Sequence, residues 1–596
     1  MRSLVSLRGI LLLLLACESQ LAAAIPPLQK PLLQDNSHES ESAESSLKQK
    51  YGSHGAVASE TAICSNIGVD LMRQGGTAAD AMVATTLCVG VIGMYHSGIG
   101  GGGFMLVRGP DGSYETVDFR ETAPAAAFED MYEGNLLGSV FGGLAVAVPG
   151  ELRGLEYLHK KYGALPWKTV VMPAVHVARH GFPISEDHVR YMDSATNSAG
   201  NFLTEDPVWA EDFAPHGKRL KLGEIITRKR YADTLETIAN EGIGVLYSGS
   251  LAKEVVDTIQ ASNGSITLDD LENFQLVLRP AVNTTFRGRR LFSTGAPSSG
   301  AIVLSVLKTM EQFPIVDSDG NSDANLTTHR FDEALRFGYG ARSHFGDPSY
   351  VKGVFELEAS LLSAENAVAN SHKIRDDTTL PVKEYNPSGY YAEPGHGTSH
   401  VVTSDNSGLA ISSTTTINTL FGSTLMTPKS GIILNNQMND FSIPQAHNEF
   451  GYPPSPANFI QPGKRPLSSI TPVMAEDLVD DGNGGTVGKL ILVTGAAGGS
   501  RIISSTAQVA WHVLDHNMSI SDALAEPRLH DQLAPNYVSF EAKYDSGIVA
   551  GLAERGHNVT WVNNWYSAVQ GIHILPNGLF EASGEPRQLN SGGTVF

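Results

Sequence analysis

Thr398 stands in a Gly395-His-Gly-Thr segment, just before an alternating run that predicts a β-hairpin. A threonine hydroxyl is a weak nucleophile, but it becomes useful when the α-amine of the same residue serves as its base. A free α-amine has a pKa of about 7.7–8.0, close enough to neutrality to accept a proton. The bond after Gly397 must be cut first, and Gly397 makes the backbone there easy to bend. A structural threonine at the start of a strand is the alternative, and these residues alone leave both interpretations open.

Other chemistries fit the chain less well. The stretch GIGGGG at 98–103 matches the dinucleotide fingerprint, but a predicted helix precedes it and a predicted strand follows it, which inverts the required context. The chain contains no G-x-S-x-G, H-E-x-x-H or C-x-x-C motif and no EF-hand loop. We therefore expect no nucleotide, no metal and no organic cofactor.

Several motifs, taken in order, resemble the γ-glutamyltranspeptidases (glutathione hydrolases), a family of N-terminal-nucleophile hydrolases. They are GGGGF at 100–104, DFRE at 118–121, AVPGE at 147–151, GALPW at 163–167, GTSH at 397–400, TTTIN at 414–418, NNQMND at 435–440, PLSS at 466–469 and GAAGG at 495–499. The resemblance covers about residues 55–596. It implies an α+β fold with a four-layer αββα core.

The resemblance also implies that the precursor cleaves itself between Gly397 and Thr398. A heavy chain, 55–397, and a light chain, 398–596, would then remain together as a heterodimer. Thr398 would form a γ-glutamyl acyl-enzyme from glutathione or another γ-glutamyl amide. Water, or the amine of an amino-acid or dipeptide acceptor, would resolve it.

Two further features of the family's reaction centre have counterparts here. Thr416 matches the threonine whose hydroxyl bonds the nucleophile and assists both maturation and catalysis. Gly498 and Gly499 fit an oxyanion hole, because no Cβ blocks the approach to their N–H groups. A tight turn before the next helix is the alternative explanation of the two glycines.

A γ-glutamyl group carries an α-carboxylate and an α-ammonium, so its pocket needs charges of both signs. Arg120 can donate two parallel hydrogen bonds to the carboxylate. The remaining matched residues complete the pocket: Ser468 and Ser469 as hydroxyl donors to the carboxylate, Asp440 for the ammonium, and Gln437 and Asn418 as additional oxygen acceptors.

Gln437 stands where mammalian members have Glu, as it does in many microbial members. The missing negative charge predicts weaker ammonium binding with activity retained. Asn439 replaces a common Asp and is expected to point away from the donor. The Pro-rich segment 441–460 occupies the position of the family's lid loop.

Two alternatives stay open from the sequence. One is a related acylase acting on glutaryl- or cephalosporin-like amides, whose substrates can lack the α-ammonium. The other is an uncleaved, non-catalytic homologue. The set of Arg120, Asp440, Ser468 and Ser469 favours a γ-glutamyl substrate, while Thr398 and Thr416 favour catalysis.

These residues must be positioned by elements that the chain pattern also predicts. Helices are expected at 60–73, 77–91, 150–162, 230–240, 249–262, 301–312, 328–342 and 504–516, and strands at 104–108, 115–119, 399–403, 409–416 and 489–494. Strands cluster early and late, and helices dominate the middle. This order favours one interleaved, layered α+β domain over separate domains.

Cys64 and Cys88 lie on two predicted helices joined by Gln74-Gly-Gly76. Cys64 precedes Gly75 by eleven residues and Cys88 follows it by thirteen, so an antiparallel helix pair would place them at similar heights. In an oxidising compartment this spacing predicts a disulfide. Two buried free thiols are the alternative.

The bulk composition limits both partners and location. The 596 residues carry a net charge of −21, which argues against nucleic acid as a partner. Residues 1–24 have the anatomy of a signal peptide, with an uncleaved anchor as the alternative, and 25–54 read as a disordered polar linker. Asn-x-Ser/Thr sites at Asn263, Asn283, Asn325, Asn517 and Asn558 suit a glycosylated protein of the secretory pathway. We expect a secreted protein, with a vacuolar or membrane-anchored one as the alternatives.

Overall fold

The computed structural model describes residues 51–315, 323–391, 397–447, 453–480, 482, 485–563 and 567–596. The predicted signal peptide and most of the predicted polar linker, up to residue 50, lie outside the described residues. Within the end of that linker, the His54 amide donates to the carbonyl oxygen of Phe596 at 2.8 Å. The chain is therefore held in place from just before its first strand.

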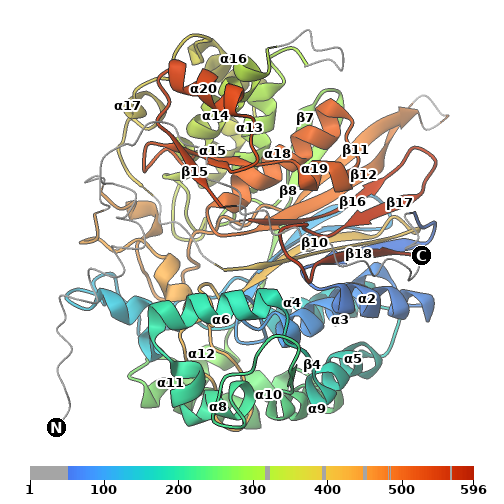
Figure 1. Cartoon of the computed structure of the whole chain (residues 1–596), viewed down its shortest axis with the longest axis vertical. Helices are drawn as coiled ribbons and strands as arrows, with labels where there is room; N and C mark the ends of the chain where they lie inside the picture. The colour runs from blue at the N-terminus through green and yellow to red at the C-terminus, as the bar shows by residue number, and fades with distance from the viewer. Residues whose placement is uncertain are drawn as a thin grey trace.

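Two large antiparallel sheets form the centre of the molecule (Figure 1). The seven-stranded sheet has the order β18 (Gly592–Val595), β1 (Gly55–Ser59), β9 (Ser399–Asp405), β10 (Ala410–Thr416), β2 (Gly102–Arg108), β3 (Tyr114–Asp118) and β6 (Val277–Pro280). The six-stranded sheet has the order β17 (Phe580–Ser583), β16 (Ala568–Ile574), β12 (Thr486–Ala497), β11 (Val473–Asp480), β8 (Arg289–Ser293) and β7 (Val282–Phe286). Smaller sheets pair β4 (Phe182–Pro183) with β5 (Ile225–Ile226), and β13 (Leu529–His530) with β14 (Val538–Glu541) and β15 (Val559–Val562).

The central strands are buried on both faces because both faces are covered. Successive side chains of a strand point to opposite faces. Val401 accordingly belongs to the core under one helical layer, and Val402 to the core between the sheets. On the six-stranded sheet, Val473 belongs to the core under the other helical layer, and Met474 belongs to the core between the sheets.

Helices cover the outer face of each sheet (Figure 1). The first layer contains α2 (Ala62–Arg73), α3 (Ala78–Ile92), α4 (Glu151–Tyr162), α5 (Trp167–His180), α6 (Glu186–Ala199), α7 (Phe202–Glu205), α8 (Pro207–Phe213), α9 (Lys229–Glu241), α10 (Gly244–Tyr247), α11 (Ser250–Ala261) and α12 (Leu268–Glu272). The second contains α13 (Gly300–Met310), α14 (Ala324–Arg342), α15 (Val354–Leu361), α16 (Ala364–Lys373), α17 (Val382–Tyr385), α18 (Arg501–His516), α19 (Ile520–Ala525) and α20 (Ser546–Glu554). The order helix, sheet, sheet, helix confirms the predicted αββα sandwich. Short 3₁₀ turns complete the described elements: η1 (Leu136–Ser139), η2 (Gly143–Ala145), η3 (Gln437–Asp440) and η4 (Pro456–Asn458).

Both sheets are built from strands on either side of Thr398. In the seven-stranded sheet, β9 and β10 lie between β1 and β2, and in the six-stranded sheet β11 pairs with β8. The segments before and after residue 398 therefore share two sheets and two layers of core.

A disulfide joins Cys64 on α2 to Cys88 on α3, with the two Cα atoms 5.4 Å apart. Both cysteines are buried in the core under the first helical layer. The predicted pairing of the two helices and of their cysteines is confirmed.

Two further observations bear on location. Four of the Asn-x-Ser/Thr asparagines are exposed, and the fifth, Asn325, is half-buried. Within the part of the chain that the structure describes, every helix is too short or too polar to cross a membrane.

Candidate active site

Thr398 lies directly before β9, at the end of the central hairpin of the seven-stranded sheet. In that hairpin Ser399 pairs with Thr415, so Thr398 and the last residue of β10, Thr416, lie at the same end. Thr398 is only 4% exposed. The antiparallel register therefore brings together two threonines that are 18 positions apart in the sequence.

Both threonine hydroxyls contact one carbonyl oxygen, that of Gly397. The Oγ1 of Thr398 donates to it at 2.6 Å, and the Oγ1 of Thr416 donates to it at 2.8 Å. The backbone N–H of Asn418 donates to the Thr416 hydroxyl at 2.7 Å. In the continuous chain the Thr416 hydroxyl thus polarises the peptide bond that precedes Thr398. Its bond to the nucleophile stays a prediction.

Gly498 and Gly499 follow β12 and immediately precede α18. Their φ angles are 126° and 63°, a region that other residues rarely adopt. Among the described residues, neither backbone N–H has an acceptor. Gly498 shares the wall of a cavity with Thr398. Two N–H groups near the nucleophile, at the positive end of a helix, suit an oxyanion hole.

Arg120 and Asp440, predicted to bind opposite charges of the substrate, are bonded to each other. The Arg120 Nη2 forms a short ion pair with the Asp440 Oδ2. Arg120 is almost completely buried, and its Nε also points to the carbonyl oxygen of Pro466 at 3.4 Å. Each charge stabilises the other, which limits the cost of burying them.

Gln437 contacts this ion pair, and Asn418 contacts the residue that precedes Gln437. The Gln437 Nε2 donates to the Asp440 Oδ2 at 2.7 Å, while its buried Oε1 has no hydrogen-bond partner among the described residues. The Asn418 Nδ2 donates to the carbonyl oxygen of Asn436 at 3.0 Å, which leaves its Oδ1 as an acceptor. A buried acceptor without a partner costs about 1–3 kcal/mol, a cost that an incoming ammonium would remove.

Both predicted serines have their oxygen lone pairs engaged by N–H donors. The Ser468 Oγ accepts from the Ile470 amide at 3.2 Å, and the Ser469 Oγ accepts from the Arg342 Nη2 at 2.9 Å. A hydroxyl that accepts in this way keeps its hydrogen available to donate. Ser468 and Ser469 are therefore suited to bind a carboxylate.

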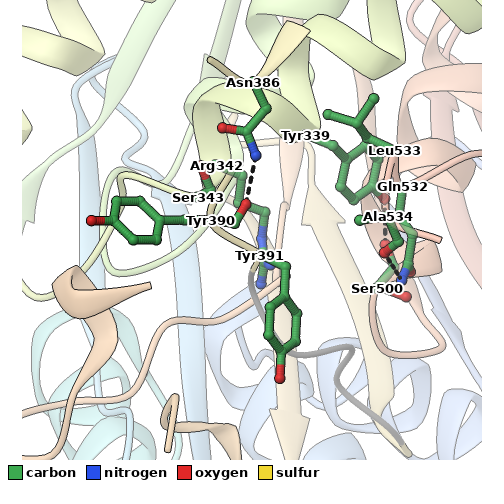
Figure 2. A pocket seen from close by; sticks show the side chains of 10 residues that line it. All are labelled: Tyr339, Arg342, Ser343, Asn386, Tyr390, Tyr391, Ser500, Gln532, Leu533 and Ala534. Carbon is green, nitrogen blue, oxygen red and sulfur yellow. Dashed lines mark hydrogen bonds between the residues drawn. The ribbon is translucent and has the colours of Figure 1, made fainter. Parts of the chain in front are cut away.

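Arg342 is a site residue that the sequence did not reveal. It lies at the end of α14, is buried, and also donates from Nε to the Ser299 Oγ at 3.0 Å. Burial lowers the pKa of its guanidinium, and the nearby Asp440 opposes that shift. Figure 2 shows Arg342 in a small cavity, of about 20 Å³, that is too small for a γ-glutamyl group. This cavity is therefore not the donor pocket, and Arg342 is linked to the predicted donor site through its bond to Ser469.

Glu60 and His96 form a second supporting group that was not foreseen. The Ser399 hydroxyl donates to the Glu60 Oε1 at 2.8 Å, and the His96 Nδ1 lies 3.0 Å from the Glu60 Oε2. A Cβ added to Gly397 would lie 3.2 Å from the His96 ring and 2.9 Å from the Asn418 carbonyl oxygen. Glycine is therefore required at the predicted cleavage position for space as well as for flexibility.

Two buried carboxyl groups, Glu121 and Glu151, lie next to this region. Burial raises the pKa of each to about 8. The Thr415 hydroxyl donates to the Glu151 Oε2 at 2.7 Å. Neither oxygen of Glu121 has a hydrogen-bond partner among the described residues, and the Arg120 Nη1 lies 3.8 Å from the Glu121 Oε2. Burial thus favours the protonated, neutral form of both carboxyl groups.

A separate buried cluster has the composition of a metal site. Ligand-type atoms of His329, Glu333 and His557 lie within 4.8 Å of one another. The His329 Nδ1 and His557 Nε2 are 2.7 Å apart, a hydrogen-bond distance, and Glu333 accepts from the hydroxyls of Thr379 and Tyr385 at 2.6 Å each. We interpret the cluster as a hydrogen-bonded network between α14 and the segment after α20.

Comparison with known proteins agrees with this geometry. The family model described as gamma-glutamyltranspeptidase matches residues 64–594. A "Glutathione hydrolase proenzyme" of Arthroderma benhamiae is 49% identical over 555 residues, covering 91% of this chain and 93% of the relative. A "Glutathione hydrolase" of Aspergillus flavus is 46% identical over 543 residues, covering 91% of this chain and 89% of the relative.

Among solved structures, a cephalosporin acylase from Bacillus halodurans superimposes with a TM-score of 0.80 and 24% identity. The superposition covers 95% of this chain and 99% of the acylase. At that identity the likeness establishes the shared fold only.

Proposed function

The chain belongs to the γ-glutamyltranspeptidase family, and we propose that it matures by cleaving itself before Thr398, which then acts as its catalytic nucleophile. The observation that carries this proposal is the pair of threonine hydroxyls on the Gly397 carbonyl oxygen, at 2.6 and 2.8 Å. One hydroxyl lies against the carbonyl group that it would attack, and the other can stabilise the charge that the attack creates.

Maturation is an acyl shift followed by hydrolysis. The Thr398 Oγ1 adds to the Gly397 carbonyl carbon, and Thr416 donates a hydrogen bond to the developing oxyanion. The C–N bond then breaks, its nitrogen takes a proton, and the Gly397 acyl group is held as an ester on Thr398. Water hydrolyses the ester and leaves a carboxylate on Gly397 and a free α-amine on Thr398.

The new α-amine supplies the base for turnover. It removes the proton of its own hydroxyl as Oγ1 attacks the γ-carbonyl carbon of the donor, and it returns that proton to the departing nitrogen. The N–H groups of Gly498 and Gly499 would bind the oxyanion. Water or an acceptor amine then attacks the γ-glutamyl ester, which releases the product and restores the hydroxyl.

Donor recognition separates the Arg120–Asp440 pair. The α-carboxylate takes Arg120 together with the hydroxyls of Ser468 and Ser469, and the α-ammonium takes Asp440. The Gln437 Oε1, without a partner in the structure, and the Asn418 Oδ1 complete the ammonium site. The carboxylate of the substrate thus replaces Asp440 as the partner of Arg120, and its ammonium replaces Arg120 as the partner of Asp440.

The heavy and light chains, 55–397 and 398–596, are expected to remain a heterodimer. Cleavage leaves β9 and β10 between β1 and β2, so separating the chains would open both sheets. We further propose that the enzyme enters the secretory pathway, because a signal-like segment, a disulfide and exposed glycosylation motifs occur together.

The test combines chain analysis with kinetics. On a denaturing gel, the purified protein should yield a light chain whose N-terminal sequence is Thr-Ser-His-Val, and Thr398→Ala should remain a single chain without activity. γ-Glutamyl anilide should be hydrolysed and glutaryl anilide, which lacks the α-ammonium, should not. An intact wild-type chain, or a preference for the glutaryl compound, would contradict the proposal.

A further inference from the structure

Asn458, the last residue of η4, connects the two halves of the predicted donor site through its side-chain amide. Its Nδ2 donates to the backbone carbonyl oxygen of Asp440 at 2.7 Å, and its Oδ1 accepts from the backbone N–H of Leu467 at 2.9 Å. Asp440 is assigned to the ammonium of the donor, and Leu467 directly precedes Ser468, which is assigned to the carboxylate. One side chain thus links the backbone at both charge-binding positions.

The relative position of these two backbone segments matters for binding. The ammonium and the α-carboxylate of a γ-glutamyl group are attached to the same carbon atom, so the protein groups that bind them must keep a fixed separation. Binding groups have to be held within about 0.5 Å of the productive geometry by the contacts that support them. A shift of either segment would therefore move one binding group away from its charge.

The link through Asn458 does not depend on the Arg120–Asp440 ion pair. In the proposed function the donor separates that pair, because its carboxylate takes Arg120 and its ammonium takes Asp440. The bonds of Asn458 go to backbone groups of Asp440 and Leu467, so they can be retained while the side chains exchange partners. Asn458 can thus hold the two halves together in the complex as well as in the free protein.

Burial and chemistry confine the Asn458 side chain to one orientation. The residue is only 1% exposed. One of its partners is a carbonyl oxygen and the other is an N–H, so an amide satisfies both in a single orientation. The backbone carbonyl oxygen of Asn458 also accepts from the Ser442 amide at 3.0 Å. Loss of the side-chain amide would leave buried backbone groups without partners, which is costly.

Lys464 holds the segment that carries Asn458. Its Nζ donates to the carbonyl oxygens of Ala457 at 2.9 Å and Phe459 at 2.8 Å, the residues on either side of Asn458. The lysine is completely buried. Hydrogen bonds from an ammonium are stronger than those between neutral groups. The backbone around Asn458 is therefore fixed on both sides by one cation.

We propose that Asn458 is a positioning residue for donor binding, which keeps the ammonium-binding and carboxylate-binding halves of the site in register, and that Lys464 holds Asn458 in place. The inference rests on the proposed function. Among the described residues, the side-chain bonds of Asn458 and Lys464 reach neither Gly397 nor Thr416. Loss of these bonds should therefore weaken donor binding without slowing maturation.

The test measures donor binding and maturation in the same variants. Asn458→Leu keeps the shape of the side chain without its two hydrogen bonds, and it should raise the KM for γ-glutamyl-p-nitroanilide about tenfold, with kcat within about threefold of wild type. Asn458→Asp keeps an oxygen to accept from Leu467 and should raise the KM by less. Lys464→Met should act in the same direction as Asn458→Leu. The half-time of maturation on a denaturing gel should equal that of wild type in all three variants.

The matched control is Gln508→Met. Gln508 on α18 is also a buried side-chain amide that bonds a backbone carbonyl and a backbone N–H, both of Leu529, at 2.8 and 3.0 Å. Its replacement should lower the melting temperature and leave the KM for the donor unchanged. This control separates the positioning effect from a general loss of stability.

A KM that stays at the wild-type value in Asn458→Leu, or an equal rise of the KM in Gln508→Met, would overturn the inference alone. Thermal unfolding identifies a variant that does not fold; if Asn458→Leu is one, the KM of Asn458→Asp decides in its place. A wild-type enzyme that releases no p-nitroaniline would overturn the proposed function, and the inference with it.

Discussion

The hydroxyl of Thr416 donates a 2.8 Å hydrogen bond to the carbonyl oxygen of Gly397, which belongs to the peptide bond that the proposed maturation breaks. The direction of this bond is fixed, because the Thr416 oxygen itself accepts from the Asn418 amide. A donor held in this way stabilises negative charge on the carbonyl oxygen without having to reorient. In the proposed maturation, Thr416 therefore acts before any substrate binds.

Replacing Thr416 by Val should slow maturation by about 10²-fold, since it removes a preorganised oxyanion donor while keeping the side-chain shape. Thr416→Ser keeps the donor and should mature at close to the wild-type rate. The measurement is the half-time for conversion of purified precursor into the two chains on a denaturing gel. Maturation of the Val variant at the wild-type rate would show that this hydrogen bond is not needed.

Asp440→Asn should raise the KM for γ-glutamyl donors about 10- to 100-fold, because a charged hydrogen bond to the ammonium is lost. Its effect on the rate of maturation should be small, since Asp440 does not contact Gly397. The neighbouring Asn439 offers a control: its Nδ2 donates to the Ser139 hydroxyl, away from Arg120. Asn439→Ala should leave donor KM unchanged, and equal effects of the two variants would contradict the assignment.

Arg342→Gln should raise the KM for the donor several-fold, which is the effect of weakening about one charge-assisted hydrogen bond. Arg342 itself is not expected to contact the donor. The reason is positional: Ser469 loses the N–H that directs its hydroxyl hydrogen toward the carboxylate. Lysine can restore one donor, so Arg342→Lys should recover part of the affinity. A general folding defect would instead reduce kcat and the melting temperature together, which thermal unfolding of each variant would reveal.

The hairpin around Thr398 could be predicted because its information is local. Alternating residues at 399–403 and 409–416 predict two strands. In the structure the first strand extends to Asp405, and the second runs from Ala410 to Thr416. The helix before Arg342 was also expected, and it begins four residues earlier, at Ala324, because Asp323 caps it by accepting from the amides of Asn325 and Leu326.

Contacts between distant segments could not be predicted in the same way. The bond from Arg342 to Ser469 spans 127 positions and that from Ser399 to Glu60 spans 339, and neither residue type carries a spacing signal. The family resemblance predicted Arg120 and Asp440 as separate binding residues, but it did not predict their ion pair. Their pairing depends on how β3 and η3 approach each other in the folded chain, which no sequence pattern encodes.

Removing the Cys64–Cys88 disulfide should lower the stability of the protein by about 3 kcal/mol. The bond closes a loop with a sequence separation of 24 and thereby restricts the unfolded chain. Cys64→Ala/Cys88→Ala is the suitable variant, because both sites are buried and apolar. Its melting temperature should no longer respond to a thiol reductant, whereas that of the wild type should fall. A wild type that is insensitive to reductant under unfolding conditions would argue against the bond.

Glu151 should make the stability of the protein decrease as the pH rises. Burial raises its pKa to about 8, from an ordinary value near 4.5, so between these values the folded state holds a proton that the unfolded state has lost. The free energy of unfolding should therefore fall by up to about 1.4 kcal/mol per pH unit from this group across the window from about pH 4.5 to 8. Glu151→Gln keeps an oxygen to accept from Thr415 and does not titrate. The melting temperature of the variant, relative to wild type, should rise steadily between pH 5 and 8, and a constant difference would show that Glu151 is already ionised in the folded protein.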